Sequence, residues 1–342
     1  MRSFGGLTGA IIITKTRYAL PDMTLPYTSS IPRTSSLTDP HGRKVNSLRL
    51  SVTQRCDLSC PHCHREGQSP SSNEMSVAEI ERAVDIASSL GIRKIKITGG
   101  EPLMRQDIVE IARSISPLVD EVSLTTNGSH LAELAESLKE SGLMRVNVSL
   151  HTLDPVRYER LCGHDLTSPV MDGIKKAVSA GLNPVKVNMV VIKGQNEDEI
   201  RPMIDFCANI GATLQLIEYE TDRAGQSQAE FAKKYYPLKE IEDSLAKEAV
   251  DMKTNELHRR RRYKLMSGEG SVQVEVVRPM HNTEFCSHCT RLRLSSDGRL
   301  KPCLLDPSGS IDILGPMRRG ASDEEVRALF TEAVRNRKPY WR

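Results

Sequence analysis

Strand-like and helix-like stretches alternate from residue 47 to residue 219, and this alternation restricts the fold more than any other feature of the chain. The expected strands are residues 47–53, 93–98, 121–125, 145–150, 185–192 and 213–219. The expected helices lie between them, at residues 76–90, 106–115, 130–141, 170–180 and 197–210. A helix that connects two strands returns the chain to the starting end of the sheet, so the strands pair in parallel. Six such units predict an α/β fold, a partial (β/α)6 TIM-like barrel.

Polar residues occupy every second position of these strands. Arg49, for example, lies between Leu48 and Leu50, and the later strands repeat the pattern. Alternate side chains of a strand point to opposite faces, so one face is apolar and the other carries basic and hydroxyl groups. We expect the helices to cover the apolar face and the polar face to line an inner cavity, with Arg49, Lys94, Lys96 and Lys186 pointing inward. An antiparallel sheet with one wet face would show the same alternation, but the intervening helices argue against it.

Composition and cysteine usage narrow the class of protein. The chain has 342 residues, 38% hydrophobic and 27% charged, which predicts a soluble globular protein of about two domains. Its net charge of +3 argues against a nucleic-acid-binding protein, and no apolar run is long enough for a membrane helix. Six of the eight cysteines fall in two groups, which predicts metal-binding or catalytic thiols in the cytoplasm rather than disulfides. Cys162 and Cys207 stand alone and are expected to be buried.

Three regions are expected along the chain. Residues 1–37 are rich in Ser, Thr and Pro and predict a disordered extension, with a transit-like segment or a start at Met23 as alternatives. Residues 38–220 hold the barrel. Residues 221–342 predict a smaller domain that bears the second cysteine group, with strands at 263–265, 271–277, 291–294 and 299–303 and a helix at 324–334. The arginine run at residues 259–262 predicts a solvated face, with an anion site as the alternative.

Cys56, Cys60 and Cys63 directly follow the first expected strand. A [4Fe–4S] cluster normally takes four thiolates, so three leave one iron open for a substrate or cofactor. Zinc completed by His62 or His64 is an alternative on spacing alone, although structural zinc usually has four closed ligands. Ferredoxin-type electron transfer uses a different spacing. The C-x3-C-x2-C pattern resembles the signature of radical S-adenosylmethionine (SAM) enzymes, whose open iron binds SAM.

The segment from Thr98 to Pro102 reads TGGEP and ends the second expected strand. Glycines allow a ligand to come close to the backbone, and barrel ligands lie at this end of the strands. The segment resembles the SAM-binding GGEP element of radical SAM enzymes, which implies that Glu101 and the nearby backbone face the methionine amine. A Gly-Gly pair on its own usually forms only a turn.

Cys286, Cys289 and Cys303 form the second group. On spacing alone, zinc completed by His281 or His288 is an open alternative, while a radical SAM barrel upstream favours a second cluster.

Residues 38–335 resemble the GTP 3′,8-cyclase family of molybdenum-cofactor biosynthesis. Residues 285–304 match that family almost residue for residue, and further matches lie at residues 39–43, 48–53, 98–102, 125–128, 147–150 and 185–196. The resemblance implies two [4Fe–4S] clusters, one that activates SAM and one that holds the purine of GTP.

The resemblance also implies roles for individual residues. It assigns the first cluster to Cys56, Cys60 and Cys63, and the second to Cys286, Cys289 and Cys303. The implied SAM-binding residues are His62, Gly100, Ser149 and Glu220. The implied GTP-binding residues are Arg49, Lys94, Lys96, Thr125, Lys186, Arg291 and Arg293. Arg291 and Arg293 share a strand face and are the catalytic candidates, expected to steer or reduce the cyclised radical. Lys and Arg are the natural partners of a triphosphate, and buried basic residues need an anion.

The reaction implied is that of a lyase. A 5′-deoxyadenosyl radical removes hydrogen from C3′ of GTP, the C3′ radical attacks C8 of guanine, and an electron and a proton complete the ring. The product is (8S)-3′,8-cyclo-7,8-dihydroguanosine 5′-triphosphate. The expected partners are GTP, an electron donor such as ferredoxin or flavodoxin, and the downstream cyclic pyranopterin monophosphate synthase. A homodimer is compatible with the sequence, and neither nucleic acid nor a membrane is expected.

Several positions depart from the family pattern. His62 replaces an aromatic residue, Lys96 and Gln215 replace arginines, and Glu220 replaces a SAM-contacting methionine. The chain ends in KPYWR rather than in the Gly-Gly tail of many members, and Trp341 is a candidate to take that place. Together with the CHREG sequence after the first cluster, these features resemble the archaeal branch.

Two other functions are compatible with the cysteine groups. A two-cluster radical SAM enzyme that modifies a peptide would share both groups but would not need a cation-rich interior. A zinc- or cluster-bearing binding module would not be an enzyme. His151 ends the fourth expected strand and is either a site residue or a core or rim histidine.

Overall fold

The computed structural model describes residues 36–68, 71–221, 229–255, 257–268, 270–280, 282–306 and 308–338. Almost all of the expected N-terminal extension lies outside the described residues, as do His281 and Trp341. No helix of the described residues is both long enough and apolar enough to cross a membrane.

One mixed sheet organises the described chain. Its strands are β1 Ser47–Ser51, β2 Lys94–Thr98, β3 Glu121–Thr126, β4 Arg145–Ser149, β5 Val185–Val191, β6 Thr213–Glu218, β7 Asp251–Thr254, β8 Arg261–Ser267, β9 Gly270–Val277, β10 Arg291–Leu294, β11 Arg299–Lys301 and β12 Ile311–Asp312. Their order across the sheet is β12-β11-β10-β1-β2-β3-β4-β5-β6-β9-β8-β7. The strands from β10 to β9 in this order pair in parallel, and antiparallel strands extend the sheet at both ends. Because β12 and β7 are free edges of the described sheet, the barrel is partial, as predicted.

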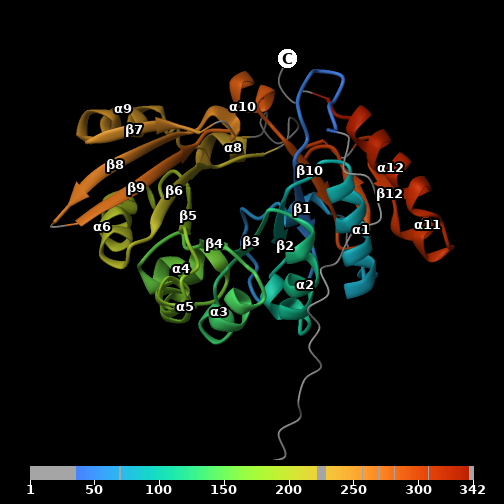
Figure 1. Cartoon of the computed structure of the whole chain (residues 1–342). Coiled ribbons are helices and arrows are strands. Elements are labelled where there is room, and N and C mark those ends of the chain that lie inside the picture. The colour runs from blue at the N-terminus through green and yellow to red at the C-terminus, as the bar shows by residue number, and fades with distance from the viewer. Residues whose placement is uncertain are drawn as a thin grey trace, which may run out of the picture. The chain divides into compact units, whose positions relative to one another are not determined.

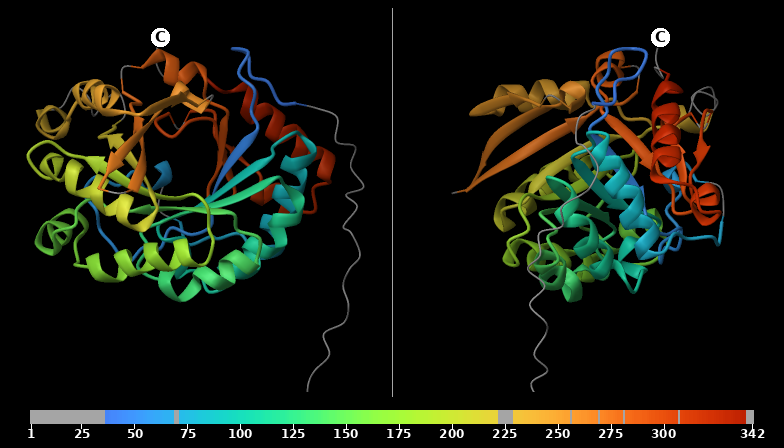
Figure 2. Two further views of the ribbon diagram at one scale, coloured as in Figure 1. Left: turned by 60° about the vertical axis from the view of Figure 1, so that its left-hand side comes forward. Right: turned by 45° about the vertical axis from the view of Figure 1, so that its right-hand side comes forward.

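Helices cover the outer face of the parallel strands (Figures 1 and 2). The helices are α1 Val77–Ser89, α2 Ile108–Ile115, α3 Leu131–Glu140, α4 Pro155–Cys162, α5 Thr167–Ser179, α6 Ile200–Ile210, α8 Ala229–Lys234, α9 Lys239–Glu248, α10 Thr283–Ser287, α11 Leu314–Arg318 and α12 Asp323–Arg335. The sequence predicted α1, α2, α3, α5, α6 and α12. It did not predict α4 or α9, or the short helices α8, α10 and α11.

Local signals explain where the first helix begins. Ser76 and Glu79 cap α1 reciprocally: Ser76 Oγ accepts from Glu79 N at 3.2 Å, and Ser76 N donates to Glu79 Oε2 at 2.8 Å. Such a capping box satisfies two backbone donors that the helix leaves unpaired. The same arrangement at Ser322 and Glu325 starts α12.

The alternation in the strands separates a packed face from a polar face. Leu48, Leu50, Ile95 and Ile97 are almost completely inaccessible and belong to the main core. Burial of each such side chain stabilises the fold by about 1.5–3 kcal/mol. The opposite face carries the basic residues, so the period of two decides which side chains line the interior.

Residues from both predicted domains contribute to this sheet. β9 pairs with β6, and β10 pairs with β1. The C-terminal part therefore extends the parallel core at both of its ends. The boundary near residue 220 remains a prediction.

Candidate active site

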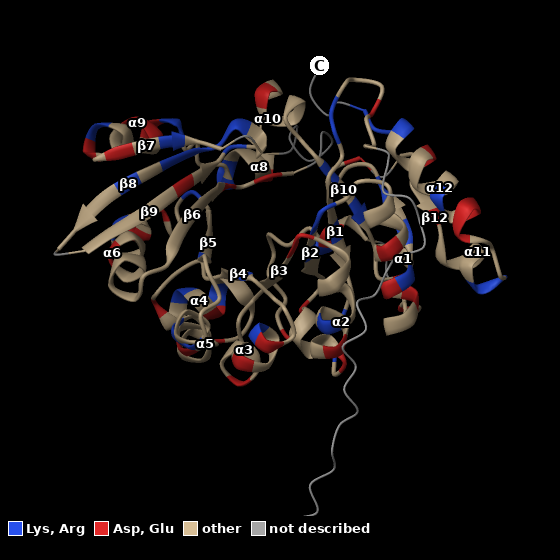
Figure 3. Ribbon diagram, in the orientation of Figure 1, with Lys and Arg blue, Asp and Glu red and all other residues tan. Residues whose placement is uncertain are grey.

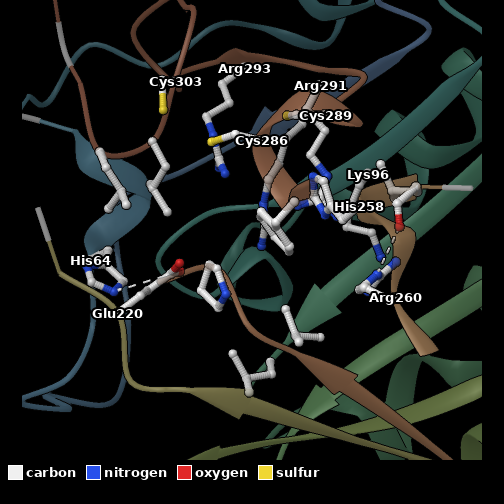
Figure 4. A pocket seen from close by; sticks show the side chains of 18 of the residues that line it. His64, Lys96, Glu220, His258, Arg260, Cys286, Cys289, Arg291, Arg293 and Cys303 are labelled. Carbon is white, nitrogen blue, oxygen red and sulfur yellow. Dashed lines mark hydrogen bonds and ion pairs between the residues drawn. The ribbon is translucent and has the colours of Figure 1, made fainter. Parts of the chain in front are cut away.

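The polar face of the parallel strands lines two adjoining cavities, of about 290 Å³ and about 550 Å³. Arg49, Lys96, Lys186 and Arg291 line both. The smaller cavity is also lined by the following residues of the predicted site: His62, Thr125, Glu220, Cys286, Cys289, Arg293 and Cys303. Figure 4 labels all of these except His62 and Thr125. Lys94 lines only the larger one. Neither cavity is lined by Gly100, Ser149, Cys56, Cys60 or Cys63.

Strand register explains why the basic side chains converge. Arg49 on β1 pairs with Lys96 on β2 and with Arg293 on β10. Lys186 on β5 pairs with Asn147 on β4. Paired residues of neighbouring parallel strands point to the same face, so these side chains form rows across the cavity wall. The predicted inward orientation of Arg49, Lys96 and Lys186 is confirmed, whereas their contact with GTP stays a prediction.

Basic residues far outnumber acidic ones among the described residues that line the cavities. Figure 3 shows Lys and Arg in strands β1, β8 and β10. Among the described residues that line the larger cavity, the only carboxylate is that of Glu121, and the basic residues are Arg43, Lys44, Arg49, Lys94, Lys96, Arg145, Lys186, Arg260, Arg262 and Arg291. Lys96 Nζ donates to Asn147 Oδ1 at 2.9 Å and has no carboxylate partner among the described residues. Burial, followed by repulsion from Arg145 and Arg49, holds the pKa of Lys96 well below its usual value. Such a wall suits an anion with several charges.

A fully buried carboxylate orders one side of the basic wall. Glu275 accepts from Lys186 Nζ at 2.7 Å and from Gln215 Nε2 at 2.7 Å, and it pairs with Arg262 at 2.8 Å. Burial lowers the pKa of Lys186 to about 8, while the ion pair with Glu275 opposes the shift. One negative charge therefore positions several cations without neutralising them all.

Glu66 is a second carboxylate that positions cations of the basic wall, on the side opposite Glu275. It approaches Arg49 Nε at 2.9 Å, and it accepts from Arg293 Nη1 at 2.7 Å and from Thr98 Oγ1 at 2.9 Å. Although burial acts in the opposite direction, Arg49 and then Arg293 lower the pKa of Glu66. Glu66 belongs to the loop that carries the first cysteine group, so this contact connects that loop to the cavity.

The arginine run at 259–262 divides between solvent and the interior. The side chain of Arg259 is 47% exposed and pairs with Glu284, whereas that of Arg260 is 12% exposed, lies 3.7 Å from Glu275 and lines both cavities. His258 and Arg259 have positive φ angles, which redirect the chain just before Arg260. The predicted solvated face is therefore wrong for Arg260, and the anion-site alternative fits it. Arg145, which lines both cavities from the start of β4, was also missed.

The first cysteine group lies in the loop between β1 and α1. Cys56 and Cys63 are exposed, Cys60 is half-buried, and all three are free thiols. Asp57 fastens the loop to the end of β3, since it accepts from Asn127 Nδ2 at 2.6 Å and from Ser129 Oγ at 2.8 Å. The loop is thus held at the carboxyl ends of the strands with its thiols available.

Gly100 and Glu101 have packing roles at the end of β2. A Cβ atom at Gly100 would overlap the carbonyl oxygens of Gln54 and Arg55, so the glycine admits the start of the cysteine loop. The carboxylate of Glu101 accepts from Thr126 Oγ1 at 2.7 Å, Asn127 N at 2.6 Å and Leu103 N at 2.9 Å. Burial raises its pKa to about 7 despite these hydrogen bonds. SAM contacts of this segment stay predictions.

The second cysteine group lines the smaller cavity directly. Cys286 lies in α10, Cys289 precedes β10 and Cys303 follows β11, and all three thiols are free and half-buried.

A buried triad holds the turn between the first two of these cysteines. Arg43 donates to the carbonyl oxygen of Cys286 at 3.2 Å, and Arg337 donates to that of Cys289 at 2.7 Å. Asp39 binds both arginines, at 2.6 Å and 2.9 Å. Segments near the two ends of the described chain therefore fix the backbone of the cysteine turn.

Replacing Asp39 by asparagine is expected to destabilise the protein by about 3 kcal/mol, because two buried arginines lose their counter-charge. It should also lower the iron bound by the second cysteine group, since the turn loses its anchor. Thermal unfolding and iron analysis of the reconstituted protein measure both effects. Asp323→Asn is the matched control, because it breaks the partly exposed pair of Asp323 with Arg82. Equal iron content and stability in the two variants would contradict the role of Asp39.

The histidines near the first cysteine loop differ in their surroundings. His62 contacts His151 edge-on, with ring centroids 4.6 Å apart. Burial, followed by the charge of His64, lowers the pKa of His62 to about 4, so its ring is neutral near pH 7. His151 is buried and its Nδ1 accepts from Val190 N at 3.1 Å, which supports the core alternative. His64 Nε2 lies 3.9 Å from a carboxylate oxygen of Glu220, and both residues line the smaller cavity (Figure 4).

The donor sets fit iron–sulfur clusters in their chemistry. Six free thiols lie in two groups, each on a loop fixed by hydrogen bonds. Among the described residues, no three Cys, His, Asp or Glu side chains are close enough to hold a single metal ion. A cluster places each thiolate on a different iron, so its cysteines lie farther apart than the ligands of one ion. Cys162 and Cys207 are buried, as predicted.

Comparisons with known families cover nearly the whole described chain. Residues 50–207 match the family model "Radical SAM superfamily", and residues 212–342 match "Molybdenum Cofactor Synthesis C".

Curated relatives are similar over almost their full length. A Thermococcus kodakarensis protein named "Probable GTP 3′,8-cyclase" is 52% identical over 307 residues, which cover 90% of this chain and 100% of the relative. A protein of the same name from Pyrococcus abyssi is 52% identical and covers 89% of this chain and 99% of the relative. One from Methanothermobacter thermautotrophicus is 44% identical, with 89% and 98% covered.

Solved structures are similar in fold. Streptococcus suis SuiB bound to S-adenosylmethionine superimposes with a TM-score of 0.56 at 20% identity, over 77% of this chain and 60% of that chain. SuiB bound to the precursor peptide SuiA gives a TM-score of 0.59 at 18% identity, over 84% and 68%.

Proposed function

The chain belongs to the GTP 3′,8-cyclase family of radical SAM enzymes, and from that premise we propose that it converts GTP to (8S)-3′,8-cyclo-7,8-dihydroguanosine 5′-triphosphate in molybdenum-cofactor biosynthesis. Family membership implies two [4Fe–4S] clusters and SAM as cofactors. The relatives at 52% identity come from Thermococcus and Pyrococcus, in agreement with the archaeal resemblance of the sequence.

One observation carries the proposal beyond family membership. The second cysteine group opens into the same cavity as a wall of Lys and Arg side chains that far outnumber the carboxylates. A nucleoside triphosphate fits both parts: its base can lie near the second cysteine group, and its negatively charged phosphates can bind the Lys and Arg side chains. A peptide substrate is the alternative, since SuiB, which is similar in fold, is bound to a precursor peptide in its solved structure. A peptide substrate would not explain this excess of buried cations.

In the proposed reaction, the cofactors supply the radical and the protein binds and orients the substrate. Cys56, Cys60 and Cys63 would hold the cluster that binds SAM. When bound, the reduced cluster and SAM supply a 5′-deoxyadenosyl radical that can abstract a hydrogen atom from ribose. The protein binds and orients the triphosphate through Arg49, Lys96 and Lys186, and the walls of the cavity keep water from the substrate.

The roles of the individual site residues belong to the proposal. His62 and Glu220 line the cavity at the side of the first cysteine loop, which supports contact with SAM. Thr125, Arg291 and Arg293 line it with the second cysteine group, which supports contact with GTP. Arg293 is held by Glu66 at 2.7 Å, while Arg291 has no ion pair within the described ranges, so Arg291 is the freer of the two to move with the substrate.

The partners also belong to the proposal. The ring closure needs a one-electron donor such as ferredoxin or flavodoxin, and its product is the substrate of cyclic pyranopterin monophosphate synthase. A homodimer is part of the same proposal.

An anaerobic reaction tests the proposed function. Reconstituted protein is mixed with SAM, dithionite and GTP, and the products are identified by mass spectrometry. We expect 5′-deoxyadenosine together with the cyclised triphosphate. SAM cleavage with GTP returned intact would overturn the assignment of GTP and leave the radical SAM assignment in place.

A further inference from the structure

His258 is a buried imidazole whose two ring nitrogens have no hydrogen-bond partner among the described residues. It is 3% exposed and lines the smaller cavity together with Cys286 and Cys289. Figure 4 shows it on the side of the cavity where Lys96 and Arg260 lie. Neither a motif nor a strand period marks this residue in the sequence.

The backbone is strained where it places this ring. His258 has φ 58° and ψ 13°, and Arg259 follows with φ 50°. Left-handed conformations at two successive residues other than glycine are unfavourable, and a buried polar atom without a partner adds to the cost. The ring is held in place by stacking on Phe285, with centroids 3.7 Å apart and planes at 24°. Strain and unpaired polar atoms in one cavity-lining residue indicate contact with a ligand.

The surroundings of His258 decide which part of a ligand it can bind. Burial, followed by the charges of Arg291 and Arg260, holds the pKa of His258 far below its usual value. The ring is therefore neutral and offers one hydrogen-bond donor and one acceptor. A neutral ring has no charge to attract a phosphate, and the neighbouring cations already suit that task. The matching partner is a neutral heterocycle that has both donors and acceptors on its edge.

We propose that His258 recognises the purine base of the nucleotide, with its imidazole hydrogen-bonded to the polar edge of guanine. The inference rests on the proposed function, since it takes GTP as the substrate. The larger, strongly basic cavity accommodates the phosphates, which leaves the base near the second cysteine group, next to His258 and Phe285. His258 is then a residue that selects guanine, separate from the residues that bind the triphosphate.

Equilibrium binding to the reconstituted holoenzyme tests this assignment. Dissociation constants are measured anaerobically, without SAM or reductant, for GTP, ATP and inorganic tripolyphosphate. In His258→Phe we expect GTP to bind about tenfold more weakly, the effect of losing one hydrogen bond in a buried site. Tripolyphosphate should bind as it does to the wild type, and the preference for GTP over ATP should shrink. His258→Asn, whose amide keeps a donor and an acceptor, should recover part of the affinity for GTP. His164→Phe, at an exposed position outside both cavities, is the matched control.

Each outcome either supports the inference or overturns it. Unchanged binding of GTP to His258→Phe would overturn it. Equal losses for GTP and ATP would also overturn it, because they would show that the ring only fills space. A parallel loss of tripolyphosphate binding would mean that the substitution disturbs the whole cavity, and His258→Asn would then have to restore the preference for GTP for the inference to stand. A wild-type holoenzyme that binds tripolyphosphate but not GTP would overturn the proposed function itself.

Discussion

Replacing Cys63 by alanine is expected to abolish SAM cleavage, whereas replacing Cys289 is expected to abolish GTP conversion and leave SAM cleavage measurable. The reason is that each cysteine group has an anchor of its own. The loop of Cys63 is fastened to the end of β3 through Asp57, and the turn of Cys289 is fastened by Asp39, Arg43 and Arg337. Loss of one cluster should therefore spare the other. Anaerobic assays of 5′-deoxyadenosine and of cyclised GTP, with iron analysis, measure the separation.

The iron content gives a second readout of the same experiment. Either variant should fall from about eight to about four iron atoms per chain, the difference of one [4Fe–4S] cluster. Cys207→Ala is the matched control, because Cys207 is a buried thiol in α6 outside both cavities and should leave iron and activity unchanged. If the Cys289 variant lost SAM cleavage as well, or the Cys63 variant kept it, the assignment of the two groups to separate clusters would be contradicted.

The central fold follows from local patterns in the sequence. The strands β1 to β6 repeat a period of two, and the intervening helices carry their own boundary signals, such as Ser76 with Glu79. The pairing of β10 with β1 and of β9 with β6 could not be predicted in the same way. These contacts join segments far apart in the chain, and no short-range signal specifies such partners. The free edge β7 was also missed, since all its residues are exposed and it lacks the alternation of a half-buried strand.

The candidate site was predictable only where a strand period or a motif marks the residue. Arg49, Lys96 and Lys186 alternate with buried apolar residues, so their inward orientation could be inferred. The anchoring carboxylates Glu66 and Glu275 were not inferred, because their roles arise from contacts with residues far away in the chain. The arginine run could not be divided into exposed and buried members, because the left-handed turn at His258 and Arg259 has no glycine to mark it.

The difference between exposed Arg259 and buried Arg260 leads to the second large prediction. Arg260→Gln is expected to weaken the binding of both GTP and tripolyphosphate about 10- to 100-fold, because a buried charge that bonds a phosphate contributes about 1.5–3 kcal/mol. Arg259→Gln removes the same charge one residue earlier, from a side chain that is 47% exposed and paired with Glu284. It should change either dissociation constant less than about twofold, since exposed ion pairs contribute little.

The comparison of neighbouring arginines separates local contact from the general attraction of a basic protein for an anion. Both substitutions lower the net charge by the same amount, so a long-range effect would weaken binding equally and would fade as salt screens it. A direct contact in the cavity is screened much less and depends on position. Arg260 lies 3.7 Å from Glu275, which also holds Lys186, so its loss removes one cation from an ordered set. Equal effects of Arg259→Gln and Arg260→Gln at physiological salt would show that the cavity attracts phosphate only through its overall charge, and Arg260 would lose its place in the site.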